Sequence, residues 1–354
     1  MTKKALIAMS GGVDSTAAAY LTKQAGYDCE GVTLKLYHGE QVGQKTCGSL
    51  LEIEDARAAA NRINMPFHVF EYKQEFERCV IDRFVKTYME GGTPNPCIDC
   101  NKYIKFGKLI DTAVEMGFDC IVTGHYARIE FCEETGRWLL KKGLDESKDQ
   151  SYVLYGLTQF QLAHTLLPLG GMSKEDARKI AFENGFENAH KKDSQDICFV
   201  PDGDYVSFIK GYTGFSFPDG DFVHLDGRVL GRHKGIIGYT IGQRKGLGLS
   251  LPAPAFVCGK DVTNNRVILG SNEDLFTTVC EATDINLISV PEIKGEMRVK
   301  AKVRYRQKEQ WATVTQPEPD KLRIVFDEPQ RAIAKGQAVV LYQDDIVVGG
   351  GTLL

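Results

Sequence analysis

Three of the ten cysteines stand among neighbours that could give their thiols chemistry. Cys97 and Cys100 form a Cys-x-x-Cys pair directly after Pro94 and Pro96, at the predicted start of a helix. Backbone N–H groups and the helix dipole at such a start lower the pKa of a thiol and favour the nucleophilic thiolate. Cys198 lies much further along the chain, where the predicted α/β region ends. These positions are candidates for nucleophilic sulfur chemistry or for metal binding.

The other seven cysteines show no such context. A cytosolic chain keeps its thiols reduced, so ten cysteines do not indicate a disulfide framework. A structural zinc site usually needs two Cys-x-x-Cys pairs. The sequence has only the pair Cys97 and Cys100. We predict small, buried packing residues at Cys29, Cys47, Cys79, Cys120, Cys132, Cys258 and Cys280.

A glycine loop, Ser10-Gly11-Gly12-Val13-Asp14-Ser15, follows the apolar stretch Ala5–Met9 and precedes the predicted helix Thr16–Ala25. Glycines let backbone amides approach an anion, and the helix start adds positive dipole, so the loop suits a phosphate. The Walker pattern GxxxxGK[ST] and its lysine are absent. The alternative is a plain strand–helix turn.

The first 200 residues or so alternate strand and helix signals, which predicts a Rossmann-like α/β domain with a parallel sheet. Ser49 with Glu52, and Ser173 with Asp176, predict helix starts. The predicted strands here are Ala5–Met9, Gly31–Leu36, Phe67–Phe70 and Asp119–Thr123, and the last follows a helix with apolar residues at Tyr103, Phe106, Ile110 and Ala113.

After Val200 glycine and proline become frequent and helical periodicity disappears, which predicts two small β domains, the last a β-barrel. The predicted domains are 1–202, 203–279 and 280–354. Short strands are expected at Phe222–Leu225, Ala255–Cys258, Arg266–Leu269 and Val339–Tyr342.

Composition sets limits on location and partners. No apolar run reaches the ~18 residues that a membrane helix needs, and the N-terminus lacks a secretory pattern, so we expect a cytoplasmic protein. The net charge of −4 gives no global attraction to nucleic acid. RNA binding would then need local basic patches, since phosphate contacts dominate affinity.

One such patch is predicted where basic residues occupy every second position from 298 to 308. A strand would put them all on one face, suited to a phosphate backbone. The alternative is a solvated edge strand guarded by lysines. The residues are Arg298, Lys300, Lys302, Arg304, Arg306 and Lys308, and Arg244-Lys245 add a second basic loop.

The glycine loop resembles the PP-loop of ATP pyrophosphatases, which cleave ATP to AMP and pyrophosphate. Nearly the whole chain resembles the bacterial and mitochondrial tRNA 2-thiouridylases. The matching blocks are TPNPCxxCNxxIKF (93–106), TGHYAR (123–128), KDQSYVL (148–154), DSQDICFV (193–200), GYTIGQRKGLG (238–248), VRYRQ (303–307) and GQAVVLY (336–342).

The resemblance implies an enzyme that thiolates the wobble uridine, position 34, of tRNA. It implies ATP as substrate, with Mg²⁺ on its phosphates, held by Ala8, Met9, Ser10, Gly11, Gly12, Val13, Asp14, Ser15, Leu34 and Gly124. Cys198 would carry a persulfide received from a relay protein, and Cys100 would be its partner. Asn95, Pro96 and Cys97 would meet the base, and His125, Lys148, Asp149, Gln150, Arg304, Tyr305 and Gln337 would contact the rest of the tRNA.

Position 97 departs from the family pattern, because many members have aspartate where this chain has Cys97, and Asp99 does not simply replace it. Two routes therefore stay open: the persulfide route, or a 4Fe–4S cluster held by Cys97, Cys100 and Cys198. The expected tRNAs are the glutamate, lysine and glutamine acceptors. Two other classes compete: a PP-loop synthetase acting on a small molecule, and a non-enzymatic RNA-binding protein with a structural metal.

Overall fold

The computed structural model describes residues 2–37, 49–191, 197–200 and 202–354. The chain divides into two compact units. The first comprises Met1–Ile81, Pro96–Gly203 and Asp344–Gly349, and the second comprises Asp82–Asn95, Asp204–Gln343 and Gly350–Leu354. Within the described residues no helix is long and apolar enough to cross a membrane.

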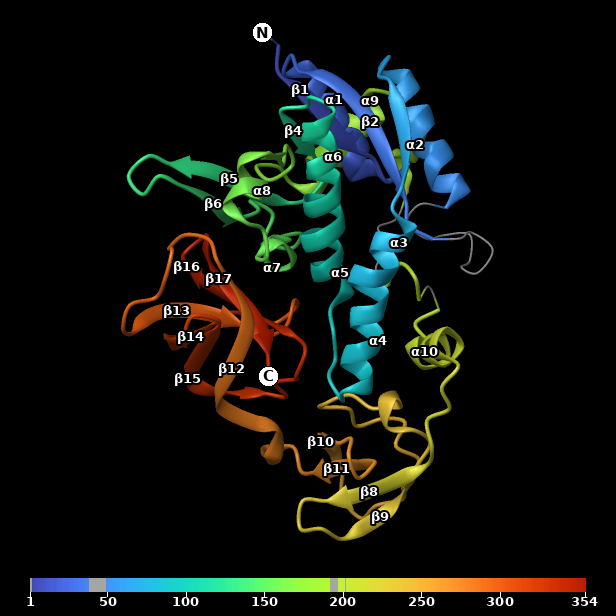
Figure 1. The fold of residues 1–354 in the computed structure, drawn as a ribbon, viewed down its shortest axis with the longest axis vertical. Coiled ribbons are helices and arrows are strands. Elements are labelled where there is room, and N and C mark those ends of the chain that lie inside the picture. Colours follow the sequence, from blue (N-terminus) through green and yellow to red (C-terminus); the bar gives the residue numbers. More distant parts are fainter. Residues whose placement is uncertain (1, 38–48, 192–196, 201) are drawn as a thin grey trace. The chain divides into compact units, whose positions relative to one another are not determined.

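The first unit is built on a parallel sheet in the order β3-β2-β1-β4-β7 (Figure 1). Its strands are β1 Lys4–Ala8, β2 Asp28–Lys35, β3 Phe67–Glu71, β4 Cys120–Val122 and β7 Thr165–Leu166. A parallel sheet needs crossover helices, and these account for the alternating pattern in the sequence. The predicted Rossmann-like α/β fold is confirmed.

Alanine-rich helices pack closely around this sheet. The helices are α1 Val13–Gln24, α2 Leu50–Arg62 and α9 Lys174–Glu183, and their buried alanines form one core with strand residues such as Ile7 and Val122. Small side chains let helix backbones approach. Both predicted helix starts are confirmed, since the Ser49 and Ser173 side chains accept hydrogen bonds from Glu52 N and Asp176 N.

Two of the remaining helices of this unit contain π-helical segments. The run α5 Pro96–Asp99, η2 Cys100–Lys108 and α6 Leu109–Glu115 is continuous, and α3 Lys73–Phe76 leads into η1 Glu77–Ile81. The wider π turns of η2 bury Ile104 and Phe106 and leave Tyr103 half-exposed. The unit also contains a hairpin of β5 Ala127–Cys132 and β6 Arg137–Lys142, and the short helices α7 Ser151–Leu154, α8 Gln159–Ala163 and η3 Glu187–His190.

The second unit contains two β structures and two helices. A four-stranded sheet has the order β10-β11-β8-β9. Its strands are β8 Gly220–His224, β9 Val229–His233, β10 Phe256–Asp261 and β11 Arg266–Gly270, and its helices are α4 Asp82–Met89 and α10 Tyr205–Thr213, with short turns η4 Ile236–Gly238 and η5 Glu273–Leu275.

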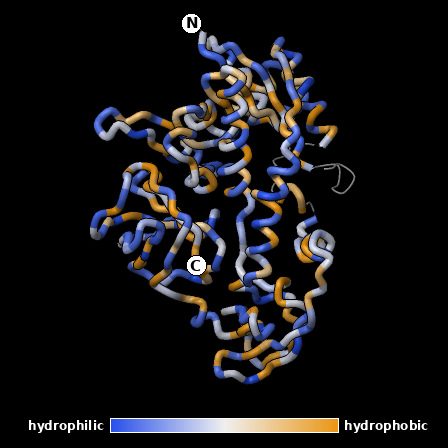
Figure 2. Tube along the Cα trace, in the orientation of Figure 1, coloured by the Kyte–Doolittle hydropathy of each residue, from blue (hydrophilic) through white to orange (hydrophobic). Residues whose placement is uncertain are grey.

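The C-terminal strands close into a barrel in the order β12-β15-β14-β13-β16-β17, with β12 also pairing β17. They are β12 Phe276–Leu287, β13 Met297–Lys302, β14 Gln310–Glu318, β15 Lys321–Arg331, β16 Ala338–Gln343 and β17 Ile346–Leu353. In β13 the buried Val299 and Ala301 alternate with Arg298 and Lys300, whereas β16 is apolar and buried from Ala338 to Tyr342; Figure 2 colours the chain by hydropathy. The predicted barrel is confirmed.

The predicted basic strand is shorter than expected. β13 ends at Lys302, because β14 begins at Gln310 and the residues between must turn the chain around. Arg304, Arg306 and Lys308 therefore lie in this connection and do not extend the face formed by Arg298 and Lys300. The proposal of one continuous basic strand face from 298 to 308 is wrong.

Candidate active site

The glycine loop lies at the carboxyl edge of the parallel sheet, between β1 and α1. Gly11 has φ +69°, and a Cβ there would lie 2.6 Å from the Glu52 carbonyl oxygen, so only glycine fits. Gly12 caps α1 and offers no side chain to occupy the first N–H groups of the helix. These donors and the helix dipole are suited to an anion.

Two serines are drawn together inside the loop. Ser10 N donates to Ser15 Oγ at 3.1 Å, the two hydroxyl oxygens lie 3.3 Å apart, and Ser15 Oγ donates to the Gly12 carbonyl at 3.0 Å. The loop is therefore compact, with hydroxyl donors next to the start of the helix. That this loop binds a phosphate stays a prediction.

Asp14, the carboxylate of this loop, is neutralised by a buried lysine. Lys174 Nζ, at the first position of α9, donates to both Asp14 carboxylate oxygens at 2.7 Å, and the Tyr126 hydroxyl donates to Oδ1 at 2.7 Å. Sequence reasoning missed both partners. The capping motif at Ser173 locates the start of α9, but no local signal in the sequence identifies its partner Asp14.

Another contact holds the loop from the chain segment after α9. Asn188 Nδ2 donates to the Gly11 carbonyl at 3.2 Å and to Thr16 Oγ1 at 2.8 Å. Lys191 Nζ reaches the same carbonyl at 3.4 Å and pairs with Asp55 at 3.0 Å. Lys191 is a functional candidate that the sequence did not single out.

The two residues predicted to flank the nucleotide lie at ends of neighbouring strands. Leu34 lies near the end of β2, half-buried, and Gly124 follows β4. A Cβ on Gly124 would lie 2.7 Å from Asp14 C and from Ser15 N, so this backbone packs directly on the glycine loop. Open α/β sheets bind ligands at this edge.

The three candidate cysteines have different environments. Cys97 is exposed on α5, Cys100 is buried as the first residue of η2, and Cys198 is half-buried. The Tyr37 hydroxyl donates to Cys198 Sγ at 2.7 Å, and the Tyr37 and Phe199 rings both pack against Phe76 of α3. A donor on sulfur favours the thiolate.

Comparison with known proteins bears on the whole chain. A family model described as a tRNA methyl transferase HUP domain matches residues 3–202, a tRNA methyl transferase PRC-barrel domain matches 206–271, and an aminomethyltransferase beta-barrel domain matches 277–353. A tRNA-specific 2-thiouridylase MnmA of Clostridioides difficile (strain 630) is 51% identical over 355 residues, covering 100% of this chain and 98% of the relative. The chain belongs to the tRNA-specific 2-thiouridylase family.

Other relatives agree with this thiouridylase assignment. A tRNA-specific 2-thiouridylase MnmA 1 of Clostridium botulinum (strain Loch Maree / Type A3) is 49% identical over 356 residues, covering 100% of this chain and 99% of the relative. Among solved structures, a 4-thiouridine synthetase–RNA complex with bound ATP is similar at 18% identity and a TM-score of 0.34, covering 60% of this chain and 50% of that one. That likeness is too distant to bear on function.

The TGHYAR and KDQSYVL blocks of this thiouridylase meet through side-chain hydrogen bonds. Gln150 Oε1 accepts from Tyr126 N at 3.0 Å, and Asp149 accepts from Gly143 N, Ser151 N and Ser151 Oγ at 2.8–3.1 Å. Asp149 and Gln150 therefore shape this turn, and Lys148 is half-exposed on it. Whether the three contact tRNA stays a prediction.

His125 is buried beside this turn. Its Nδ1 lies 2.7 Å from Thr123 Oγ1, and its ring packs against Phe106 of η2 at 5.6 Å between centroids. Burial, with a smaller contribution from the nearby Lys105 charge, holds the pKa of His125 well below its usual 6.5. The imidazole is therefore neutral at physiological pH.

The candidate RNA contacts of the second unit are held by backbone. Gln337 Nε2 donates to the Thr93 carbonyl at 2.8 Å, and Arg304 donates to the carbonyls of Ala332 and Ile241. Tyr305 is exposed, and Asn95 is half-buried. Pro96, which belongs to the first unit, is buried. Arg304 thus has a structural role independent of any RNA.

The predicted packing cysteines divide into two groups. Burial raises the pKa of Cys29 and of Cys120 to about 11 and that of Cys280 to about 12, and it also raises the pKa of Cys258, so the packing role is confirmed for the three buried thiols. Cys79, Cys132 and Cys258 are half-buried, which corrects the prediction of burial for these three. A hydrogen bond from the Thr135 side chain lowers the pKa of Cys132. Cys47 lies outside the described residues.

Proposed function

We propose that this chain is a tRNA-uridine 2-sulfurtransferase that uses ATP to replace the C2 oxygen of a tRNA uridine by sulfur. The observation that carries the proposal is one α/β unit that combines an anion-ready glycine loop with the three candidate thiols, of which Cys198 accepts a hydrogen bond from Tyr37. Full-length identity near one half to tRNA-specific 2-thiouridylases supports it. Because ATP and tRNA are cytoplasmic, we place the reaction in the cytoplasm.

The first step activates the base. ATP binds with its phosphates on residues 8–15, where the first N–H groups of α1 and the Ser10 and Ser15 hydroxyls donate to phosphate oxygens. The uridine flips out of the stack. Its C2 oxygen attacks the α-phosphorus, and pyrophosphate leaves. Mg²⁺ would be held by phosphate oxygens and would neutralise charge on the leaving group.

The second step transfers sulfur. A persulfide on Cys198, supplied by a donor protein, attacks C2 through its terminal sulfur, and AMP departs with the former C2 oxygen. The Cys100 thiolate then attacks Cys198 Sγ. The bond between the two sulfurs of the former persulfide breaks, its electron pair completes the thiocarbonyl of the base, and a Cys100–Cys198 disulfide forms. A thiol reductant must restore both thiols.

The cluster route and the persulfide route place different demands on the thiols. A 4Fe–4S cluster would need Cys97, Cys100 and Cys198 gathered around one centre. In the part of the chain that the structure describes, no three His, Cys, Asp or Glu side chains are grouped to hold a metal. We propose the persulfide route, which needs only Cys100 and Cys198 to meet, with Cys97 beside the target base together with Asn95 and Pro96.

The finer substrate assignment rests on the same family resemblance. We propose the wobble uridine, position 34, of the glutamate, lysine and glutamine tRNAs as the target. In one unit Leu34 and Gly124 would flank the nucleotide, and His125, Lys148, Asp149 and Gln150 would contact the tRNA. In the other unit the tRNA contacts would be Arg304, Tyr305 and Gln337.

Reconstitution tests the proposal directly. Purified protein, ATP, unmodified tRNA and a persulfide donor should yield 2-thiouridine by mass spectrometry, and Cys100→Ser and Cys198→Ser should each abolish it. Cys132→Ser is the matched control and should stay active. Retained 2-thiouridine in either of the first two variants would refute the sulfur route.

The same experiment separates the competing functions. A small-molecule PP-loop synthetase would release pyrophosphate without tRNA and without either cysteine, whereas the proposed enzyme needs tRNA for that release. Anaerobic purification with iron and sulfide analysis decides the cofactor. Full activity without iron supports the persulfide route, and activity that tracks bound iron would overturn it.

A further inference from the structure

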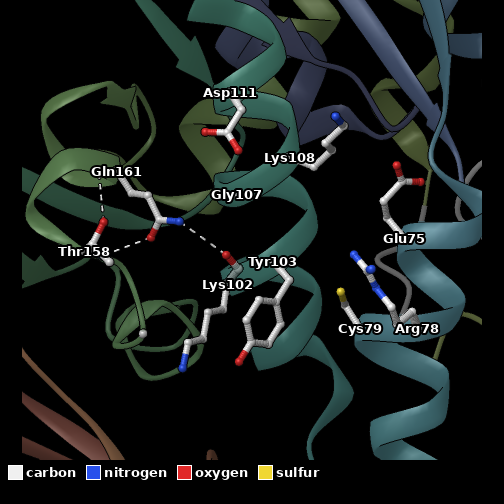
Figure 3. Close-up of a pocket in the computed structure, with 11 residues that line it drawn as sticks. Glu75, Arg78, Cys79, Lys102, Tyr103, Gly107, Lys108, Asp111, Thr158 and Gln161 are labelled. Atoms are coloured by element: carbon white, nitrogen blue, oxygen red, sulfur yellow. Dashed lines mark hydrogen bonds between the residues drawn. The ribbon is translucent and has the colours of Figure 1, made fainter.

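An open groove of about 410 Å³ lies in the first unit, lined by residues of α3, η1, η2, α6 and α8. Figure 3 shows Arg78 and Cys79 on one wall and Lys102, Tyr103 and Lys108 on the other. None of these residues belongs to the site described above. The groove therefore needs an explanation of its own.

The wall formed by η2 is fixed in place by α8. Gln161 Nε2 donates to the Lys102 carbonyl at 3.3 Å, and Thr158 and Gln161 form a reciprocal capping box at the start of α8. In a π-helix the backbone carbonyls accept hydrogen bonds from residues five positions on instead of four. In η2 the Lys102 carbonyl also accepts a hydrogen bond from the Gln161 side chain. Helix α8 therefore holds the η2 wall of the groove in a fixed position.

Cations face this groove from both walls. Among the described residues, Arg78 and Lys108 take part in no ion pair, and Arg78 is exposed. Lys102 Nζ lies 5.3 Å from the centroid of the Tyr103 ring. Positive charge beside an aromatic ring suits a nucleotide, since the phosphate meets the cation and the base stacks on the ring.

The two acidic residues of the groove lie toward one of its ends. Asp111 lies on α6, beyond the end of η2 that is farther from Cys100, and Glu75 lies on α3 before η1. Lys102 and Tyr103 lie in the first turn of η2, which begins at Cys100. A polyanion is therefore favoured most at the end near Cys100, where Lys102 lies away from both carboxylates, because at the other end Lys108 shares the groove with Asp111 and Glu75.

We propose that this groove binds the phosphate and stacked base of a tRNA nucleotide adjacent to the target uridine, with Arg78 and Lys102 on the phosphate and Tyr103 on the base. The assignment rests on the proposed function, because it takes Cys100 as the point where the target base is held. It adds a contact that positions the strand as the uridine enters.

Charge reversal tests the groove through tRNA affinity. Arg78→Glu and Lys102→Glu should each weaken tRNA binding roughly tenfold or more and reduce the slope of log affinity against log salt by about one. Lys179→Glu is the matched control, because Lys179 is an exposed cation on α9 of the same unit. Its affinity should stay close to that of the unaltered chain.

A footprint on the unaltered protein avoids any folding defect. tRNA should slow alkylation of Cys79 by N-ethylmaleimide at least fivefold, measured by peptide mass spectrometry, and leave Cys132 on the β5–β6 hairpin unaffected. Equal protection of both thiols, protection of neither, or protection of Cys79 by the persulfide donor protein in place of tRNA would overturn the proposal. Unaltered binding in both charge variants would do the same.

The experiment also distinguishes two failures. If the unaltered chain binds and thiolates tRNA while the groove variants match it, the groove assignment fails and the proposed function stands. If the unaltered chain neither binds nor thiolates tRNA, the proposed function itself fails.

Discussion

The ion pair between Lys174 and Asp14 gives the sharpest prediction for the nucleotide site. Lys174→Met removes an ammonium that donates to both carboxylate oxygens at 2.7 Å, in a side chain only 10% exposed, and leaves Asp14 with 31% of its side chain exposed. Breaking a buried pair costs about 3–5 kcal/mol. Because water reaches part of Asp14, we expect a loss of about 2 kcal/mol in the free energy of unfolding.

Lys174→Met should weaken ATP binding by more than the loss of the α9 contact alone would. An unpaired carboxylate in the loop repels the phosphates, and two unit charges 4–8 Å apart at an effective dielectric near 20 interact with roughly 2–4 kcal/mol. Since about 1.4 kcal/mol is a factor of ten, the KM for ATP should rise at least about tenfold. Pyrophosphate release in the presence of tRNA measures it.

A second substitution isolates the charge. Asp14→Asn in the Lys174→Met background removes the uncompensated carboxylate and should restore part of the ATP affinity, a coupling that packing alone does not predict. Lys179→Met on the same helix, with its side chain 69% exposed, is the control and should change unfolding by less than about 0.5 kcal/mol. A folded Lys174→Met protein with unchanged KM would refute the reasoning.

Three further predictions concern other parts of the site. Gly124→Ala places a Cβ 2.7 Å from Asp14 C and Ser15 N, so it should cost about 1–3 kcal/mol of stability and weaken ATP binding, whereas Gly171→Ala, with no heavy atom within 4 Å, should be neutral in both assays. The pKa of His125 is depressed by burial, so its contribution to stability is complete above about pH 6.5 and falls by about 1.4 kcal/mol per pH unit below it. Urea titrations at pH 7 and pH 5 should show that His125→Gln lacks this slope, and an unchanged slope would contradict the assignment. Tyr37→Phe removes the donor to Cys198 Sγ and should slow iodoacetamide labelling of Cys198 at neutral pH without affecting Cys97; equal rates in both proteins would remove Tyr37 from the account.

Local signals in the sequence predict local structure well. Ser49 and Ser173 cap their helices as expected, because an N-cap and its N–H partner lie within four residues of each other. The glycine loop was predicted for the same reason, since a strand, two glycines and a helix start are contiguous. The predicted division at 202/203 and 279/280 stays a prediction beside the two compact units.

The errors occurred where a regular period was assumed to continue. The sequence shows a helix with apolar residues at Tyr103 and Phe106, but η2 has the wider turns of a π-helix, so Phe106 is buried and Tyr103 stays half-exposed. Alternation from Arg298 to Lys308 predicted one strand, but β13 ends where antiparallel pairing with β14 forces a turn. The spacing of apolar and basic residues does not indicate the π-helical turns of η2 or the turn between β13 and β14.

The neutralisation of Asp14 shows a third limit, because its partner Lys174 is 160 residues away in the chain. The pairing of Asp14 with Lys174 also bears on how a chain of net charge −4 can bind two polyanions, ATP and tRNA. At physiological salt a charge is screened beyond about 8 Å, so the balance over the whole chain matters less than the charges next to each phosphate. At the loop Asp14 is paired with the buried Lys174 and Asp55 with Lys191, and in the groove Lys102 lies at the end nearer Cys100, whereas Lys108 shares the other end with the carboxylates. Local arrangement of charge, rather than its sum, therefore determines where ATP and RNA can bind.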